Sequence, residues 1–335
     1  MKKNTKSSKT RKSVKKKILK VLLFIFIVIV IFNIIGTILH ATYFKNKVEE
    51  IKPYGEMVNI YDGQMHVYSM GEGEKTIILL PGMGVSLPSA EFGPLMRTLS
   101  KKYKVVCIEY FGVGFSSETS RERSIDNYVE EIRKVLEVEQ IEPPYVLVPH
   151  SISSVFSEYY ASKYPSEIEA IISLDGTSTA YYQEMPKFVN SLLGVAKVQQ
   201  NSGFSSIMGL LATNKKDLIS KGYLEKEIND MIAFSGFSVN DNLLSQMANS
   251  ANYIKETMDL PYPKTIPYFK VISKKTYETK NSQIKISPQE YQMEHLKRIG
   301  DNVKYEILEG NHFIYFNNVD KISNIIDDVI ANNKK

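Results

Sequence analysis

The most informative stretch of this chain is a serine at the junction of an expected strand and an expected helix. Tyr145-Val146-Leu147-Val148 is an apolar run typical of a buried strand, and Pro149-His150-Ser151-Ile152-Ser153 follows it. A strand that turns sharply into a helix lifts the serine hydroxyl above the sheet edge, where the helix N-terminus favours developing negative charge. Ser151 is therefore a candidate nucleophile. The alternative is a structural serine that only caps the helix, since serine is among the best N-cap residues.

A second segment has the composition of an oxyanion-binding loop. Thr76-Ile77-Ile78-Leu79-Leu80 is typical of a short buried strand, and it runs into the flexible turn Pro81-Gly82-Met83-Gly84. Such a turn can present backbone N–H groups, and an oxyanion hole uses one donor from this position and one from the residue after the nucleophile. Met83 and Ile152 are the expected donors. An ordinary glycine turn between strand and helix is the alternative.

A third segment supplies a candidate general base. Residues 303–308 alternate as a strand does, and the loop Glu309-Gly310-Asn311-His312-Phe313 follows. A histidine just past a strand end can reach a hydroxyl on another strand and take its proton, so His312 is the candidate, against an ordinary loop histidine. The other four histidines are expected elsewhere: His40 ends an apolar segment, His66 lies in an early hairpin, His295 lies on a surface helix, and His150 points away from the serine.

In combination these motifs identify the chain as resembling the α/β-hydrolase fold superfamily over about residues 57–332. The segment Tyr110-Phe111-Gly112-Val113-Gly114-Phe115-Ser116 also resembles a loop of that family, with Tyr110 where an aspartate is common. The sequence departs from the family's Gly-x-Ser-x-Gly elbow, because Pro149 and Ser153 replace the two glycines. The resemblance implies a mostly parallel central sheet with helices on both faces, a helical cap insertion, and the chain order serine, acid, histidine.

The acid is the least certain member of the implied triad. In most of the family it follows the penultimate strand, here residues 267–273, but the next segment offers only Glu278. The fold's other known position is the end of the strand after the elbow helix, where Asp175 stands. We expect Asp175 to orient His312, with Glu278 as the alternative. A structural aspartate that bonds loop N–H groups would look the same in the sequence.

The N-terminus has the pattern of a membrane anchor. Residues 1–20 hold ten Lys or Arg and no acid, and an apolar run from Val21 reaches about Leu39. Roughly 20 apolar residues span a bilayer, and flanking positive charge stays on the cytoplasmic side. We therefore expect a single-pass cell-membrane protein with a cytoplasmic N-terminus and an extracellular catalytic domain. A cleaved signal peptide is the alternative, although the apolar run exceeds the usual core of about 7–15 residues.

These features divide the 335 residues into four parts. We expect a basic cytoplasmic tail at 1–17, a transmembrane anchor at 18–40, a tether at 41–55 and an α/β-hydrolase domain at 56–335 with a cap at about 177–263. The chain has a formal net charge of +5, so without its first ten positive charges the remainder is −5. Because the remainder is negative, the basic composition of the chain does not indicate nucleic-acid binding. The basic tail can instead contact anionic lipid headgroups. The lone Cys107 lies mid-strand, and we expect it to be a buried apolar residue.

The cap composition favours an apolar substrate. Most of its large apolar side chains must pack the cap together, and the rest can line a tunnel for an acyl group. They are Met185, Phe188, Leu192, Leu193, Phe204, Met208, Leu210, Leu211, Met231, Phe234, Phe237, Leu243, Leu244 and Met247.

The sequence therefore predicts a membrane-anchored serine hydrolase of carboxylic esters, similar to a carboxylesterase or lipase, with no metal or organic cofactor. Its partners are a small-molecule substrate with an apolar acyl group and membrane lipid. One alternative is a proline-releasing aminopeptidase whose cap carboxylates hold the substrate amine. The carboxylates in question are Glu184, Glu225, Glu227 and Asp230. The other is a non-catalytic anchored binding protein that kept the fold.

Overall fold

The computed structural model describes residues 4–182, 194–196, 199, 201–281, 284–300 and 303–333, with side chains from residue 14 onward. Some residues of the expected cap lie outside this described part, namely Glu184, Met185, Phe188, Leu192 and Leu193.

A central sheet of eight strands organises the domain, in the order β1-β2-β4-β3-β5-β6-β7-β8. β2 runs antiparallel to both β1 and β4, and the other neighbours are parallel. The strands are β1 (Glu56–Ile60), β2 (Gly63–Met70), β3 (Thr76–Leu80), β4 (Lys104–Ile108), β5 (Tyr145–Pro149), β6 (Ile168–Leu174), β7 (Tyr268–Ser273) and β8 (Lys304–Leu308). The parallel strands direct their carboxyl ends to one edge of the sheet, where the loops carrying the candidate residues gather.

The central strands β3 and β5 are buried on both faces of the sheet. Their successive side chains point to opposite sides and pack with different helices. Ile78 and Leu80 pack with α5 (Ile125–Val138) and α6 (Ser153–Lys163). Ile77 and Leu79 pack on the other face, against α4 (Gly93–Leu99) and α14 (Val319–Asn332). This double coverage explains why the strands are continuous apolar runs. It also buries Cys107.

Helix boundaries follow local capping signals. The Ser124 hydroxyl accepts a hydrogen bond of 3.2 Å from the backbone N–H of Asn127, at the start of α5. Ser287 does the same for Glu290 at 3.1 Å, at the start of α13 (Pro288–Ile299). The short helices are α3 (Pro88–Glu91), η2 (Pro165–Glu167), α12 (Lys274–Glu278) and η3 (Ile314–Phe316).

The surface position expected for His295 is wrong, because α13 turns this residue inward. Its side chain is fully buried, and its Nε2 lies 2.9 Å from the carboxylate of Glu158 on α6. The hydroxyl of Tyr268 on β7 donates to the same carboxylate at 2.9 Å. Burial, together with the nearby Lys270, lowers the pKa of His295 to about 4. A polar residue on an amphipathic helix can therefore face the core when it forms a hydrogen bond with a buried carboxylate.

Four described helices connect β6 to β7 in the region expected to form the cap. They are α8 (Phe204–Ala212), α9 (Lys215–Ser220), α10 (Glu225–Phe234) and α11 (Asp241–Met258). α11 is tied to the domain by Tyr253, whose buried hydroxyl donates to the carbonyl of Arg123.

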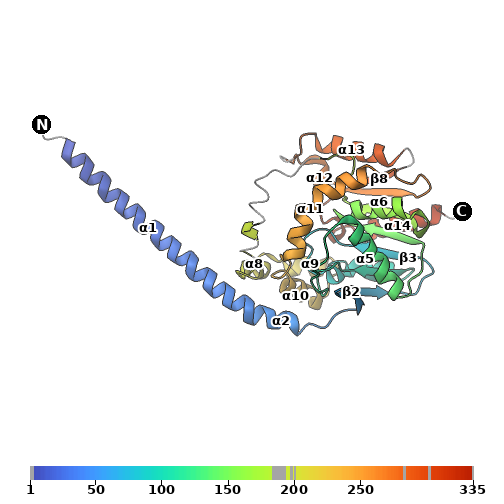
Figure 1. Ribbon diagram of the computed structural model, residues 1–335, viewed down its shortest axis with the longest axis horizontal. Coiled ribbons are helices and arrows are strands. Elements are labelled where there is room, and N and C mark those ends of the chain that lie inside the picture. Colours follow the sequence, from blue (N-terminus) through green and yellow to red (C-terminus); the bar gives the residue numbers. More distant parts are fainter. Residues whose placement is uncertain are drawn as a thin grey trace.

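The N-terminal segment is an almost unbroken helical rod that projects from the domain (Figure 1). It consists of α1 (Asn4–Leu39), the π-helical turn η1 (His40–Phe44) and α2 (Lys45–Glu49). By length and composition the rod is apolar enough to cross a membrane, and its apolar window is fully exposed. The segment expected to be a tether is therefore helical as far as Glu49, and loop follows until β1.

Candidate active site

Ser151 lies on a sharp turn between β5 and α6. Its backbone has a φ of +55°, a left-handed conformation that non-glycine residues rarely adopt. Two bonds maintain this turn: the Ser151 N–H donates to the carbonyl of Leu174 at 3.2 Å, and its own carbonyl accepts from Thr177 N–H at 3.1 Å. α6 begins at Ser153 without a side-chain cap. The Ser151 hydroxyl therefore does not cap the helix and projects from a strained elbow.

The imidazole of His312 reaches this hydroxyl from the loop after β8. Its Nε2 lies 2.8 Å from Ser151 Oγ, and its Nδ1 lies 2.7 Å from Asp175 Oδ2. The histidine side chain is 44 % exposed, whereas the Asp175 side chain is fully buried. The three groups form one continuous hydrogen-bonded series of hydroxyl, imidazole and carboxylate, an arrangement in which an acid can orient a general base.

The Asp175 carboxylate accepts hydrogen bonds from the end of β7 and from α12. The Ser273 N–H donates to Oδ1 at 2.8 Å, and the Thr276 hydroxyl donates to Oδ2 at 2.7 Å. Asp175 itself has a φ of +46°, at the end of β6. Glu278 is exposed at the end of α12. Of the two acids left open by the sequence, Asp175 is the one hydrogen-bonded to the imidazole.

The Pro81–Gly84 loop packs closely on His150 and Ser151 because residue 82 has no side chain. A Cβ placed on Gly82 would lie 2.5 Å from His150 Nδ1 and 3.0 Å from the Cβ of Ser151. Within the described part of the chain, the backbone N–H groups of Met83 and Ile152 donate to no protein acceptor. They are therefore free to bind an oxyanion formed at Ser151.

Ser153 replaces an elbow glycine with a hydroxyl that is fully satisfied. It donates to the carbonyl of Pro81 and lies 2.8 Å from the hydroxyl of Tyr110. Both side chains are buried. A buried hydroxyl with partners carries little desolvation cost, so the elbow tolerates serine at this position.

His150 supports the site in a way that the sequence did not indicate. It is buried, and its Nε2 donates to the backbone carbonyl of His312 at 2.9 Å. Burial, together with the adjacent His312, lowers the pKa of His150 to about 3. The ring therefore stays neutral at physiological pH and joins the elbow to the histidine loop. No local motif signals such a contact between residues 162 positions apart.

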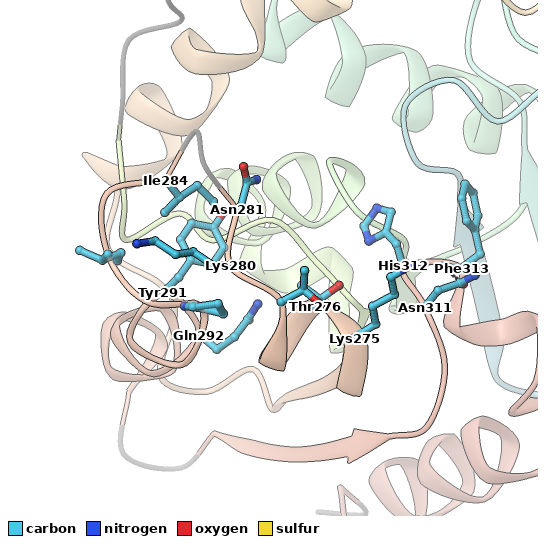
Figure 2. Close-up of a pocket in the computed structure, with 13 residues that line it drawn as sticks. Lys275, Thr276, Lys280, Asn281, Ile284, Tyr291, Gln292, Asn311, His312 and Phe313 are labelled. Atoms are coloured by element: carbon cyan, nitrogen blue, oxygen red, sulfur yellow. Dashed lines mark hydrogen bonds between the residues drawn. The ribbon is translucent and has the colours of Figure 1, made fainter.

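A pocket of about 470 Å³ adjoins His312 (Figure 2). Figure 2 shows His312 and Phe313 on one side, Ile284 and Tyr291 on the other, and α12 between them. Its described lining includes His312 but not Ser151, so the pocket opens on the histidine side of the site. Two lysines, Lys275 and Lys280, belong to the same lining.

Among the described residues, no group of three or more His, Cys, Asp or Glu side chains is arranged to hold a metal ion.

Comparison with known proteins concerns the fold of the chain. A family model described as the alpha/beta hydrolase fold matches residues 75–319. The uncharacterized protein YbdG of Bacillus subtilis is 27 % identical over 318 residues, covering 91 % of this chain and 95 % of that protein. The human serine hydrolase BPHL is 28 % identical over 116 residues, which cover 32 % of this chain and 38 % of that protein.

Solved structures show the same fold. One from work on carboxylesterases of the thaumarchaeon Nitrososphaera gargenis has a TM-score of 0.59 at 14 % identity, covering 83 % of this chain and 98 % of that one. The Cif epoxide hydrolase of Acinetobacter nosocomialis has a TM-score of 0.61 at 14 % identity, covering 86 % of this chain and 95 % of that one.

Proposed function

Because the chain belongs to the α/β-hydrolase fold family, we propose that it is a serine hydrolase that cleaves carboxylic esters through an acyl-enzyme. One observation carries this proposal: Ser151, His312 and Asp175 form a continuous hydrogen-bonded series with distances of 2.8 and 2.7 Å. A positioned base next to a hydroxyl, itself oriented by a buried carboxylate, is the arrangement that activates serine.

The proposed reaction has two stages. His312 Nε2 takes the proton of the Ser151 hydroxyl as its oxygen attacks the ester carbonyl, and the N–H groups of Met83 and Ile152 bind the oxyanion. His312 then gives the proton to the departing alcohol, which leaves an acyl-serine. Water, activated by the same imidazole, hydrolyses the acyl-serine. Asp175 maintains the tautomer of His312 and stabilises the imidazolium throughout.

The pocket beside His312 suggests where the alcohol portion of the substrate binds. The imidazole protonates the leaving oxygen, so a cavity on its side accommodates the leaving group. Ile284, Ile286 and Phe313 give this cavity apolar walls. An ester with an apolar portion is therefore the proposed substrate class.

The N-terminal rod supports a location at the cell membrane. We propose that residues 18–40 cross the bilayer, that the basic residues 1–17 remain in the cytoplasm, and that the domain from residue 56, with its cap at about 177–263, faces outward. The cluster of positive charge on one side of the apolar run supports this orientation.

An aminopeptidase receives less support from the cap carboxylates. Glu227 forms an ion pair with Arg97, and Asp230 accepts hydrogen bonds from Tyr54 at 2.6 Å and Lys226 at 2.5 Å. These carboxylates already have partners, so they are poorly suited to bind a substrate amine. A non-catalytic role is disfavoured by the complete series from Ser151 to Asp175.

The test uses the full chain reconstituted in vesicles. We expect a fluorophosphonate probe to label the wild type and not Ser151→Ala, and short p-nitrophenyl esters to be cleaved by the wild type and not by His312→Ala. The hydrolysis of dipeptide amides, measured in parallel, tests whether the protein is an aminopeptidase instead. Equal labelling of Ser151→Ala and wild type would remove the serine from its proposed role.

A further inference from the structure

Helix α8 of the cap region carries its large apolar side chains on the outside. Phe204, Met208 and Leu211 are 45 %, 43 % and 77 % exposed. Their spacing of four and three residues places them on one face of the helix. A helix at the surface of a water-soluble domain normally turns such a face inward, and an exposed apolar stripe marks an interaction site.

The inner face of α8 consists instead of small residues. Ser206 is buried, and a Cβ placed on Gly236 would lie 1.8 Å from its Oγ. A Cβ placed on Gly209 would lie 2.1 Å from Ser235 Oγ, so the helix packs tightly on the end of α10. Small residues at the protein contact and large apolar residues facing outward are the pattern of helices whose surroundings are lipid.

The N-terminus of α8 also contacts the proposed membrane anchor. A Cβ placed on Gly36 of α1 would lie 2.2 Å from the carbonyl oxygen of Ser202, and one on Gly203 would lie 2.4 Å from that of Gly36. Just beyond α1, the ring of His40 stacks on Phe237 with centroids 4.3 Å apart. α8 and the rod are therefore in direct contact.

This contact indicates how deep in the membrane the start of α8 lies. Gly36 lies three residues before the end of α1 at Leu39, and a helix rises about 1.5 Å per residue. If the span ends near residue 40, the start of α8 is about 5 Å inside the apolar layer, at the boundary between headgroups and acyl chains. Tyr43, with 54 % of its surface exposed, follows at the level where aromatic anchors occur. The exposed Lys215 and Lys216 begin α9, the next helix after α8, and can contact lipid phosphates.

We propose that α8 is a second membrane contact, whose face of Phe204, Met208 and Leu211 inserts among the acyl chains of the outer leaflet. The inference rests on the proposed anchoring of residues 18–40. The contact of α8 with lipid holds the cap against the bilayer, so that the active site lies close to ester substrates that have partitioned into the lipid.

The test places an environment-sensitive NBD fluorophore at single cysteines in the full chain, reconstituted in phosphatidylglycerol and phosphatidylethanolamine vesicles. Leu211→Cys reports α8, Ile27→Cys reports the middle of the anchor, and Glu137→Cys on α5 reports a water-exposed position. Cys107 is buried, and the unsubstituted chain controls for its labelling. Lipids with nitroxides at shallow and deep acyl positions quench the fluorophore according to its depth.

We expect the Leu211 probe to lose most of its fluorescence with the shallow nitroxide and less with the deep one. The Ile27 probe should show the reverse order, and the Glu137 probe should keep its fluorescence. Adding Phe204→Ser and Met208→Ser should release the Leu211 probe to water. A Leu211 probe that behaves like the Glu137 probe, while the Ile27 probe is quenched, would overturn the role of α8 alone. Loss of quenching at Ile27 as well would overturn the anchoring on which it rests.

Discussion

The hydroxyls of Tyr110 and Ser153 lie 2.8 Å apart beneath the nucleophile elbow. These are two of the positions at which the chain departs from the pattern of the family it resembles, with tyrosine where aspartate is common and serine in place of an elbow glycine. The two departures contact each other. Ser153 also donates to the carbonyl of Pro81. The pair therefore links the loop after β4 and the elbow to the Pro81–Gly84 loop, which carries the proposed oxyanion donor Met83.

This link predicts coupled effects on stability. Tyr110→Phe and Ser153→Ala should each lower the free energy of unfolding by about 1 kcal/mol, because each removes the hydrogen bond between the two buried hydroxyls. Ser153→Ala also removes the donor to the Pro81 carbonyl. The double variant should lose less than the sum of the two. Calorimetry on the full chain in detergent measures all four proteins, and strictly additive losses would show that the two hydroxyls do not interact.

The position of Asp175 predicts which acid supports the proposed catalysis. Asp175→Asn should lower kcat on short esters by about 10⁴-fold, because the amide favours the wrong tautomer of His312. Glu278→Gln is the matched control, since Glu278 is exposed at the end of α12, and it should keep wild-type turnover. A large loss in Glu278→Gln with activity retained in Asp175→Asn would reverse the assignment.

The bond from His150 to the His312 carbonyl predicts a positioning effect on turnover. His150→Leu should lower kcat by about 10-fold, as expected for one lost hydrogen bond. KM should change little, because His150 is not expected to touch substrate. His150→Gln keeps an N–H donor on a side chain of similar reach and should restore most of kcat. Equal losses in both variants would point to a packing role instead.

The buried carboxyl group of Glu91 should make the free energy of unfolding depend on pH. It is buried, and burial raises the pKa of Glu91 to about 7, although the Tyr315 hydroxyl that donates to it opposes this. Because the folded state holds this proton more tightly than the unfolded state, the stabilisation is complete below about pH 4.5 and is lost as the pH rises toward 7. The loss is on the order of 3 kcal/mol.

Glu91→Gln cannot titrate and should remove this dependence. Melting temperatures of the wild type and Glu91→Gln, measured by calorimetry at intervals from pH 4.5 to 7.5, test the expectation. Parallel curves for the two proteins across that range would show that Glu91 is not the titrating group.

Much of the architecture was predictable from local patterns. Apolar runs such as residues 76–80 and 145–148 mark strands buried on both faces, and the motifs around Ser151 and His312 stand at strand ends. These features depend on neighbouring residues, whose periodicity and turn preferences act over short distances. The same holds for the apolar run that marks the N-terminal rod.

Other relationships depend on which strands become neighbours. Asp175 reaches His312 because β6 pairs with β7 and β7 with β8, which brings together residues 137 positions apart. The bond from His150 to the His312 loop, the inward face of His295 and the contact of Gly36 with α8 arise in the same way. Side-chain partners of this kind are set by the order of the sheet and the packing of its helices, and no local pattern contains that information.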